Sequence, residues 1–271
     1  MVTVQPKVKQ QLSWGLIPAA GVSASAVLLF GLLNLPAGYA VLVGSLILAV
    51  VIDRSLASDL LLIGIGMGII STISVAADIS YGNMLLMGTV LTLAVLVPFL
   101  IDRYVYKRRT IVFPIRTGQK WSTLERSYLA IVLVLGWTIL PFYFIGSGSY
   151  QNWPAVSAPD EIARLFVGVN AVGIWDELFF ICTVFALLRR HFPMWQANIL
   201  QSVIFVSFLW ELGYQSWGPL LTAPFALLQG YIFSKTKSLP YVVSVHLLFD
   251  LVVFLVLVHA HNRGWLQVFF Y

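Results

Sequence analysis

Charged residues are scarce in this sequence of 271 residues: Lys and Arg number 16, Asp and Glu 11, and together they make up 10% of the chain. A soluble globular domain carries roughly 25% charged residues. Hydrophobic residues make up 59% of the chain, and a water-soluble surface cannot be built from such a composition. The composition therefore excludes soluble, disordered and fibrous proteins, and it predicts an integral membrane protein.

Cysteine is scarcer still, and a cleavable leader is not apparent. The single cysteine, Cys182, lies in an apolar run, so it forms no intrachain disulfide and is expected to be a small buried hydrophobe. Lys7 and Lys9 precede an apolar stretch. This stretch is not followed by a small-residue cleavage site and a soluble domain, as a signal peptide would be. The sequence therefore predicts a first span that is retained in the membrane.

Long apolar runs, by contrast, are abundant. A spanning helix needs about 20 mainly apolar residues. The second run is short enough to be re-entrant, and the eighth is the weakest because two prolines bracket its start. The sequence therefore predicts an all-α, polytopic integral membrane helical bundle of about nine transmembrane helices, with eight as the alternative. The predicted spans are Leu16–Leu33, Pro36–Ile52, Leu60–Ala76, Met84–Ile101, Tyr128–Ile145, Ile162–Leu188, Trp195–Leu212, Leu220–Phe233 and Tyr241–Val258.

The positions of the basic residues predict the orientation. With nine spans and a cytoplasmic N-terminus, all of the 16 Lys and Arg residues except Arg164 and Arg263 fall on the cytoplasmic side. Membrane orientation explains this basic charge better than nucleic acid, so the expected partner is a lipid bilayer, with no nucleic acid. We expect a multi-pass protein of the cell membrane. The basic loop from Asp102 to Arg126 divides the chain into N-terminal helices and their loop (1–126) and a C-terminal helical core (127–271).

Ionisable residues inside the spans are confined to the C-terminal part. Asp176 and Glu177 lie in the sixth span, Glu211 in the seventh, and His246 and Asp250 in the ninth. A charged acid at the centre of a membrane helix costs about 2.5–3.5 kcal/mol, so these residues mark a functional site by default. Counting 1.5 Å per residue places Asp176, Glu177 and Asp250 at about the same depth. The three helices are therefore expected to enclose a polar cavity.

Spacing alone leaves four roles open for this group. A carboxylate can activate water as a general base while a histidine stabilises an oxyanion, which is hydrolysis within the membrane. The residues Glu177, Glu211, His246 and Asp250 are also suitable ligands for a divalent metal such as zinc. A proton or substrate path in a transporter, or hydrogen bonds between protonated acids that join helices, would need the same residue types.

Residues 162–258 resemble the CPBP intramembrane proteases, the family that includes the CAAX prenyl endopeptidases and bacteriocin-immunity proteins. The first family motif is Glu-Glu-x-x-x-Arg, and the chain has Asp176-Glu177-Leu-Phe-Phe-Ile181. The third motif is His-x-x-x-Asn/Asp, which His246-Leu-Leu-Phe-Asp250 matches. The resemblance implies an intramembrane endopeptidase that hydrolyses a peptide bond in a membrane-associated protein or prepeptide. It implies Glu177 as base, with Asp176 as alternative or helper, and His246 and Asp250 as oxyanion stabilisers.

The chain departs from the family pattern at several positions. Asp176 replaces the first glutamate, and Ile181 replaces the arginine. The second motif, Phe-x-x-x-His, is not met: Ser207 and Glu211 take the approximate places of its phenylalanine and histidine. Glu211 is therefore expected to replace the histidine as a polar partner. The alternative prediction is a catalytically inactive membrane scaffold or a transporter built on the same helices.

Overall fold

The computed structural model describes residues 14–116, 118, 120–264 and 267–269, and within them every regular element is a helix. Nine continuous helical rods are present in this part of the chain, one for each predicted span, which confirms the all-α bundle. The rods are α1 (Leu16–Ala26) with η1 (Val27–Gly31), α2 (Leu35–Ile52), α3 (Arg54–Ile70), α4 (Tyr81–Leu100) with η2 (Ile101–Val105), α5 (Thr123–Gly146), α6 (Pro159–Asp176) with η4 (Glu177–Phe185) and α7 (Ala186–Leu188), α8 (Met194–Leu212), α9 (Pro219–Thr236) and α10 (Leu239–His261).

Side-chain caps determine where several helices begin. The carboxylate of Asp53 accepts hydrogen bonds from the backbone nitrogens of Ser55 and Leu56 at 2.7 and 3.3 Å, so α2 ends and α3 starts within one residue. At α5, Ser122 and Glu125 form a reciprocal capping box. These caps satisfy backbone N–H groups that a helix cannot pair internally.

Five of the helices in the described residues are long and apolar enough to cross a membrane: Leu35–Ile52, Tyr81–Val105, Thr123–Gly146, Pro159–Leu188 and Leu239–His261. Their outward faces expose large apolar side chains, such as Val51 and Leu85, that only lipid would solvate. The chain is therefore a multi-pass membrane protein in contact with a bilayer. In contrast, α8 lies inside the bundle and buries polar side chains, including Asn198 and Gln201.

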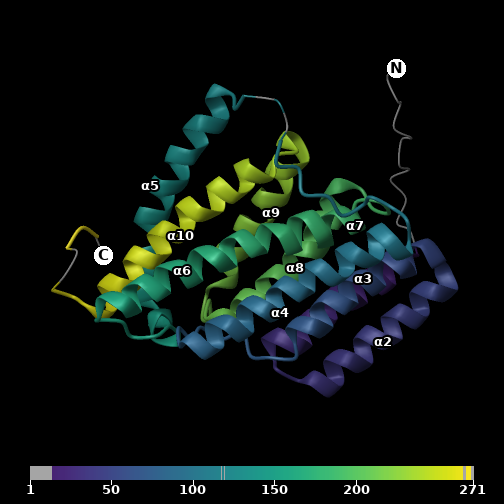
Figure 1. Cartoon of the computed structure of the whole chain (residues 1–271), viewed down its shortest axis with the longest axis horizontal. Helices are drawn as coiled ribbons and strands as arrows, with labels where there is room; N and C mark the ends of the chain where they lie inside the picture. The colour runs from purple at the N-terminus through teal and green to yellow at the C-terminus, as the bar shows by residue number, and fades with distance from the viewer. Residues whose placement is uncertain (1–13, 117, 119, 265–266, 270–271) are drawn as a thin grey trace.

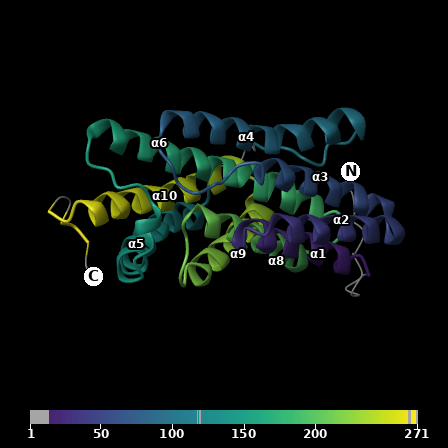
Figure 2. The same cartoon turned by 90° about the horizontal axis from the view of Figure 1, so that it is seen from below.

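The helices pack as a sequence of neighbours. In the N-terminal part, α1 packs against α2, α2 against α3, and α3 against α4. The first helix, α1, also packs against α8. In the C-terminal part α10 packs against both α5 and α6, and α9 packs against α8. In Figure 1, α5 lies at the edge of the bundle next to α10. On the other side of α10 lies α6, and α4 comes after it. Seen from below, α4 lies on one side of the bundle and α1, α8 and α9 on the other (Figure 2).

A buried ionic cluster joins the N-terminal and C-terminal helices at the basic end of the bundle. Asp59 of α3 is 1% exposed, and it pairs with Arg108 at 2.7 Å, Arg190 at 2.6 Å and His191 at 2.7 Å. Arg108 also bonds Asp102 through its Nε at 3.1 Å. Because opposite charges surround Asp59, this acid can be buried while it fixes the basic loop against the helices.

Candidate functional site

Glu177 and His246 form a buried hydrogen-bonded pair between α6 and α10. His246 Nδ1 lies 2.7 Å from Glu177 Oε1, and the two residues are 4% and 1% exposed. The Nε2 of Gln229, from α9, donates to the same Oε1 at 2.6 Å and to the carbonyl of Val242 at 3.0 Å. An ionised carboxylate only accepts hydrogen bonds, so Nδ1 carries the hydrogen when Glu177 is ionised. The Nε2 of His246 then lies on the opposite side of the ring, free of Glu177, where it accepts a hydrogen bond in the neutral ring and donates one in the protonated ring.

Two further carboxyl groups lie near that free nitrogen. Asp176 Oδ2 is 3.6 Å and Asp250 Oδ1 is 3.9 Å from His246 Nε2. Both aspartates are nearly fully buried, at 2% and 4% exposed. Asp176 Oδ1, Glu177 Oε2 and Asp250 Oδ2 have no hydrogen-bond partner among the described residues. Two helical rods, α6 with η4 and α10, thus bring three carboxyl groups around one imidazole.

Local backbone features permit this close approach. A Cβ added to Gly173 of α6 would overlap the carboxylate of Asp250, so only glycine lets α10 come this near. The helix changes to π geometry from Glu177 to Phe185, and Thr183 Oγ1 donates to the carbonyl of Leu178 at 2.9 Å. Such π segments are rare and are found frequently at functional sites.

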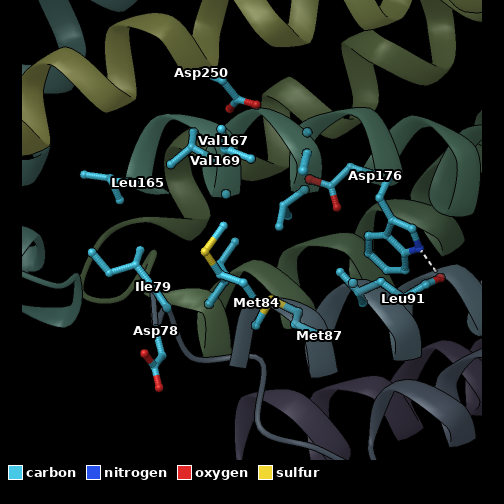
Figure 3. Close-up of a pocket in the computed structure, with 18 of the residues that line it drawn as sticks. Asp78, Ile79, Met84, Met87, Leu91, Leu165, Val167, Val169, Asp176 and Asp250 are labelled. Carbon is cyan, nitrogen blue, oxygen red and sulfur yellow. Dashed lines mark hydrogen bonds between the residues drawn. The ribbon is translucent and has the colours of Figure 1, made fainter. Parts of the chain in front are cut away.

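A cavity of about 310 Å³ lies beside the cluster, between α4, α6 and the end of α8. Its lining includes Asp176 and Asp250 but neither Glu177 nor His246, which lie behind this wall. Figure 3 shows the Asp176 carboxylate turned toward the space above Met84 and Met87. Glu177 can therefore orient His246, while Asp176 and Asp250 are the acids that a molecule in the cavity would meet.

Aromatic side chains complete the cavity wall. Trp153, Trp175 and Tyr214 all line it and are all at least nine-tenths buried. Trp175 is fixed by a hydrogen bond of 2.6 Å from its Nε1 to the carbonyl of Leu91 in α4. Burial raises the pKa of Tyr214, which follows α8, well above its usual value, so its hydroxyl stays neutral and can donate a hydrogen bond.

Glu211 does not join this group. Its Oε1 accepts hydrogen bonds from the backbone nitrogen of Val75 at 3.0 Å and from Ser74 Oγ at 3.2 Å, so it ties the end of α8 to the loop after α3. The expectation that Glu211 stands in for the motif-two histidine beside the other acids is therefore corrected. The α8 residues that line the cavity are Leu209 and Leu212, and neither carries a polar side chain.

The predicted metal site is not assembled either. Within the described residues, no group of three or more His, Cys, Asp or Glu side chains has the geometry to hold a metal ion. Of the candidate ligands Glu177, Glu211, His246 and Asp250, Glu211 is bound elsewhere, and the Nδ1 of His246 is taken by Glu177.

The sequence analysis missed Gln229, which belongs to the cluster by its contacts. The signal was present: Gln229 is an amide within an apolar stretch of α9, and it is only 2% exposed. A buried amide in such a helix needs a polar partner, and Gln229 finds one in Glu177.

The comparisons with known proteins agree with the resemblance in the motifs. Residues 158–252 match the family model described as Rce1-like, type II CAAX prenyl endopeptidase Rce1-like. No curated protein and no solved structure matches the chain. The matched residues cover α6 through most of α10 and include Asp176, Glu177, Gln229, His246 and Asp250. The segment that builds the buried acidic cluster is therefore similar to the Rce1-like type II CAAX prenyl endopeptidases.

Proposed function

We propose that this chain is an intramembrane endopeptidase of CPBP type, which hydrolyses a peptide bond in a membrane-associated protein or prepeptide. The observation that carries the proposal is the convergence of Asp176 and Asp250 on the Nε2 of His246 at the wall of a cavity. A water molecule and a peptide carbonyl in that cavity would meet a base and a group able to share a proton. The Rce1-like match of the same segment supports this class of reaction.

In the proposed mechanism, Asp176 acts as the general base. Its carboxylate takes a proton from a water molecule in the cavity, the water oxygen attacks the carbonyl carbon, and the carbonyl oxygen gains the negative charge. The imidazole of His246, protonated on both nitrogens, stabilises that oxyanion through its Nε2–H, and the Asp250 carboxylate stabilises the positive ring. Asp176 then delivers its proton to the leaving amide nitrogen, and the C–N bond breaks. The products are a carboxylate and an amine.

Glu177 has a positioning role in this mechanism, in place of the role as base that the resemblance first implied. It lies behind the cavity wall and contacts His246 through Nδ1, the nitrogen remote from the two aspartates. Gln229 holds the same Glu177 oxygen and is anchored on the carbonyl of Val242, one helical turn before His246. Together they fix the ring orientation and direct Nε2 toward Asp176 and Asp250.

A catalytically inactive scaffold is the second candidate, and one observation favours it. Leu209 lines the cavity where a histidine from α8 could help to hold the water molecule, and a leucine cannot do so. A scaffold would keep the helices and the cavity without turning over a substrate.

Cleavage assays on purified protein in lipid nanodiscs test these two candidates. A library of membrane-associated peptides is incubated with the wild type, and fragments are identified by mass spectrometry. A peptidase cleaves at least one peptide, and Asp176→Asn lowers kcat by about a thousandfold or more, as expected for loss of the base. Asp78→Asn is the matched control, because Asp78 lines the same cavity at an exposed position. Equal activity of the wild type and Asp176→Asn would reject the mechanism, and no cleavage by folded wild type would favour the scaffold.

A further inference from the structure

The charges that line the cavity are all of one sign. Asp78, Asp176 and Asp250 contribute carboxyl groups, and no Lys, Arg or His is among the described residues of the lining. Arg108, Arg190 and His191 lie instead at the other end of the bundle, where they surround Asp59. The cavity therefore presents a negative field, which the single imidazole of His246 behind its wall offsets only in part.

The carboxyl groups of Asp176 and Asp250 line the cavity, and each keeps an oxygen that the described part of the protein leaves without a partner. Asp176 Oδ1 and Asp250 Oδ2 are buried and have no hydrogen-bond partner among the described residues. Buried acids need a partner that donates hydrogen bonds or carries positive charge, because water solvates them poorly there. An anionic or purely apolar molecule in the cavity would leave these two carboxyl groups without compensation, whereas a cation would pair with them.

The remainder of the wall suits an organic cation. Trp153, Trp175 and Tyr214 offer aromatic rings, whose faces attract ammonium groups. Met84 and Met87 form the facing side and supply flexible, polarizable contacts to an apolar body (Figure 3). Carboxylates combined with aromatic rings are the chemistry by which proteins recognise amines.

We propose that this cavity is a binding site for an organic cation, meaning an apolar body that carries one protonated or quaternary amine. The cation lies against Asp176 and Asp250, and its apolar part contacts the aromatic rings and methionines. A volume of about 310 Å³ accommodates a benzylammonium-sized molecule or the side chain of a basic residue. The cavity alone supports the binding site. Its use to select a basic residue near the cleaved bond rests on the proposed function.

A charge series of ligands tests the site directly on the full-length protein in nanodiscs. The probes are benzyltrimethylammonium, its neutral carbon isostere neopentylbenzene, and the anion phenylacetate, each titrated and followed by calorimetry. Binding of the cation at least about tenfold tighter than that of the neutral isostere supports the proposal, with no binding of the anion. Equal affinity for the cation and its isostere, or preference for the anion, overturns it.

Matched acid-to-amide variants locate the bound cation. Asp250→Asn keeps the side-chain shape and is expected to weaken cation binding about tenfold or more, with little effect on the neutral isostere. Asp78→Asn is expected to change the affinity less than about twofold, because water screens this exposed carboxylate. If both variants weaken binding equally, the cation is held by general surface charge and the proposal is wrong. Should Asp250→Asn fail to fold, the ligand series on the wild type decides the question alone.

Cleavage assays with three peptides distinguish this inference from the proposed function. Three peptides of one sequence carry lysine, norleucine or glutamate at the position before the cleaved bond, and the free amine is measured in parallel. Faster cleavage of the lysine peptide, inhibited by benzyltrimethylammonium, supports a substrate cation in the cavity. Amine binding without cleavage of any peptide refutes the peptidase and leaves the binding site standing. Equal cleavage of the lysine and norleucine peptides, together with no preference for the free cation, refutes the inference and leaves the peptidase.

Discussion

Replacing Gln229 with leucine removes two hydrogen bonds from the buried cluster and keeps a side chain of similar size. The lost bonds run from Nε2 to Glu177 Oε1 at 2.6 Å and to the carbonyl of Val242 at 3.0 Å. A hydrogen bond to a charged group contributes about 1.5–3 kcal/mol and a neutral one about 0.5–1.5 kcal/mol. We therefore expect the free energy of unfolding to fall by about 2–4 kcal/mol, and by less where the lipid-embedded unfolded state supplies alternative partners.

Gln201 provides a matched control within the same bundle. Its Nε2 also makes two hydrogen bonds, to Asn198 Oδ1 and to the carbonyl of Ala226, both at 3.0 Å, and the residue is fully buried. Neither partner is a carboxylate, so Gln201→Leu is expected to cost about 1–3 kcal/mol. The difference between the two variants, about 1 kcal/mol, measures the contribution of the charged acceptor.

Two assays distinguish positioning from simple stability. Unfolding in mixed detergent micelles gives the free energies, and peptide cleavage gives kcat and KM for each variant that remains folded. Gln229→Leu is expected to lower kcat about tenfold with KM nearly unchanged, because Glu177 and the His246 ring lose a fixed orientation. Gln201→Leu should leave kcat within about twofold of the wild type. If the two variants lose equal stability and Gln229→Leu keeps full kcat, Gln229 is a structural residue only and the reasoning is refuted.

Other positions test the packing that supports the site. Gly173→Ala adds a methyl group that would overlap the Asp250 carboxylate, so we expect a loss of about 1–3 kcal/mol in thermal unfolding and a large loss of cleavage. Gly168→Ala, in the same helix with open space around it, should stabilise the protein by up to about 1 kcal/mol, and a loss like that of Gly173→Ala would contradict the argument. Asp59→Asn removes the charge that holds Arg190 at the basic end and should cost about 3–5 kcal/mol in the same unfolding assay. A cost near zero would show that water solvates this cluster.

Apolar runs allowed the helices to be predicted from the sequence. Each of the nine predicted spans overlaps a helical rod in the described residues, and the caps explain boundaries that hydropathy does not define: α3 begins at Arg54 after the cap Asp53, six residues before the predicted start. The helix α8 is the instructive case. Its apolar composition predicted only a spanning helix, and the structure shows that it is buried in the bundle, where the side chains of Asn198 and Gln201 bond to α9.

The candidate site was predicted in part, for reasons that concern helix depth and rotation. Counting residues along each helix placed Asp176, Glu177 and Asp250 at one level, and the structure brings these three acids together around His246, because the rise per residue is fixed. The depth count could not show which way the Glu211 side chain points. Side chains two residues apart on a helix, such as Leu209 and Glu211, point about 200° apart. The bond from Gln229 to Glu177 also escaped, because its partners lie 52 positions apart and no local pattern joins them.

The ion pairs of Asp59 at the basic end of the bundle could not be predicted from the sequence either. Asp59 pairs with Arg190 and His191, which follow it by 131 and 132 positions. Each residue by itself has the ordinary appearance of a charge at a helix end, and only the packing of α3 against α7 brings them together. Long-range ion pairs of this kind depend on which helices become neighbours, and composition does not determine that.

The central claim is that Asp176, Asp250 and His246 form a hydrolytic site, and the most direct test follows the oxygen of water. Wild-type protein in nanodiscs is given a cleavable membrane peptide in water labelled with heavy oxygen. The new C-terminus, which is that of the N-terminal fragment, is then analysed by mass spectrometry. One labelled oxygen in the new carboxylate for each bond cleaved, lost with Asp176→Asn and retained with Asp78→Asn, is the predicted result. Cleavage that persists unchanged in folded Asp176→Asn, or that leaves the new carboxylate unlabelled, would contradict the claim.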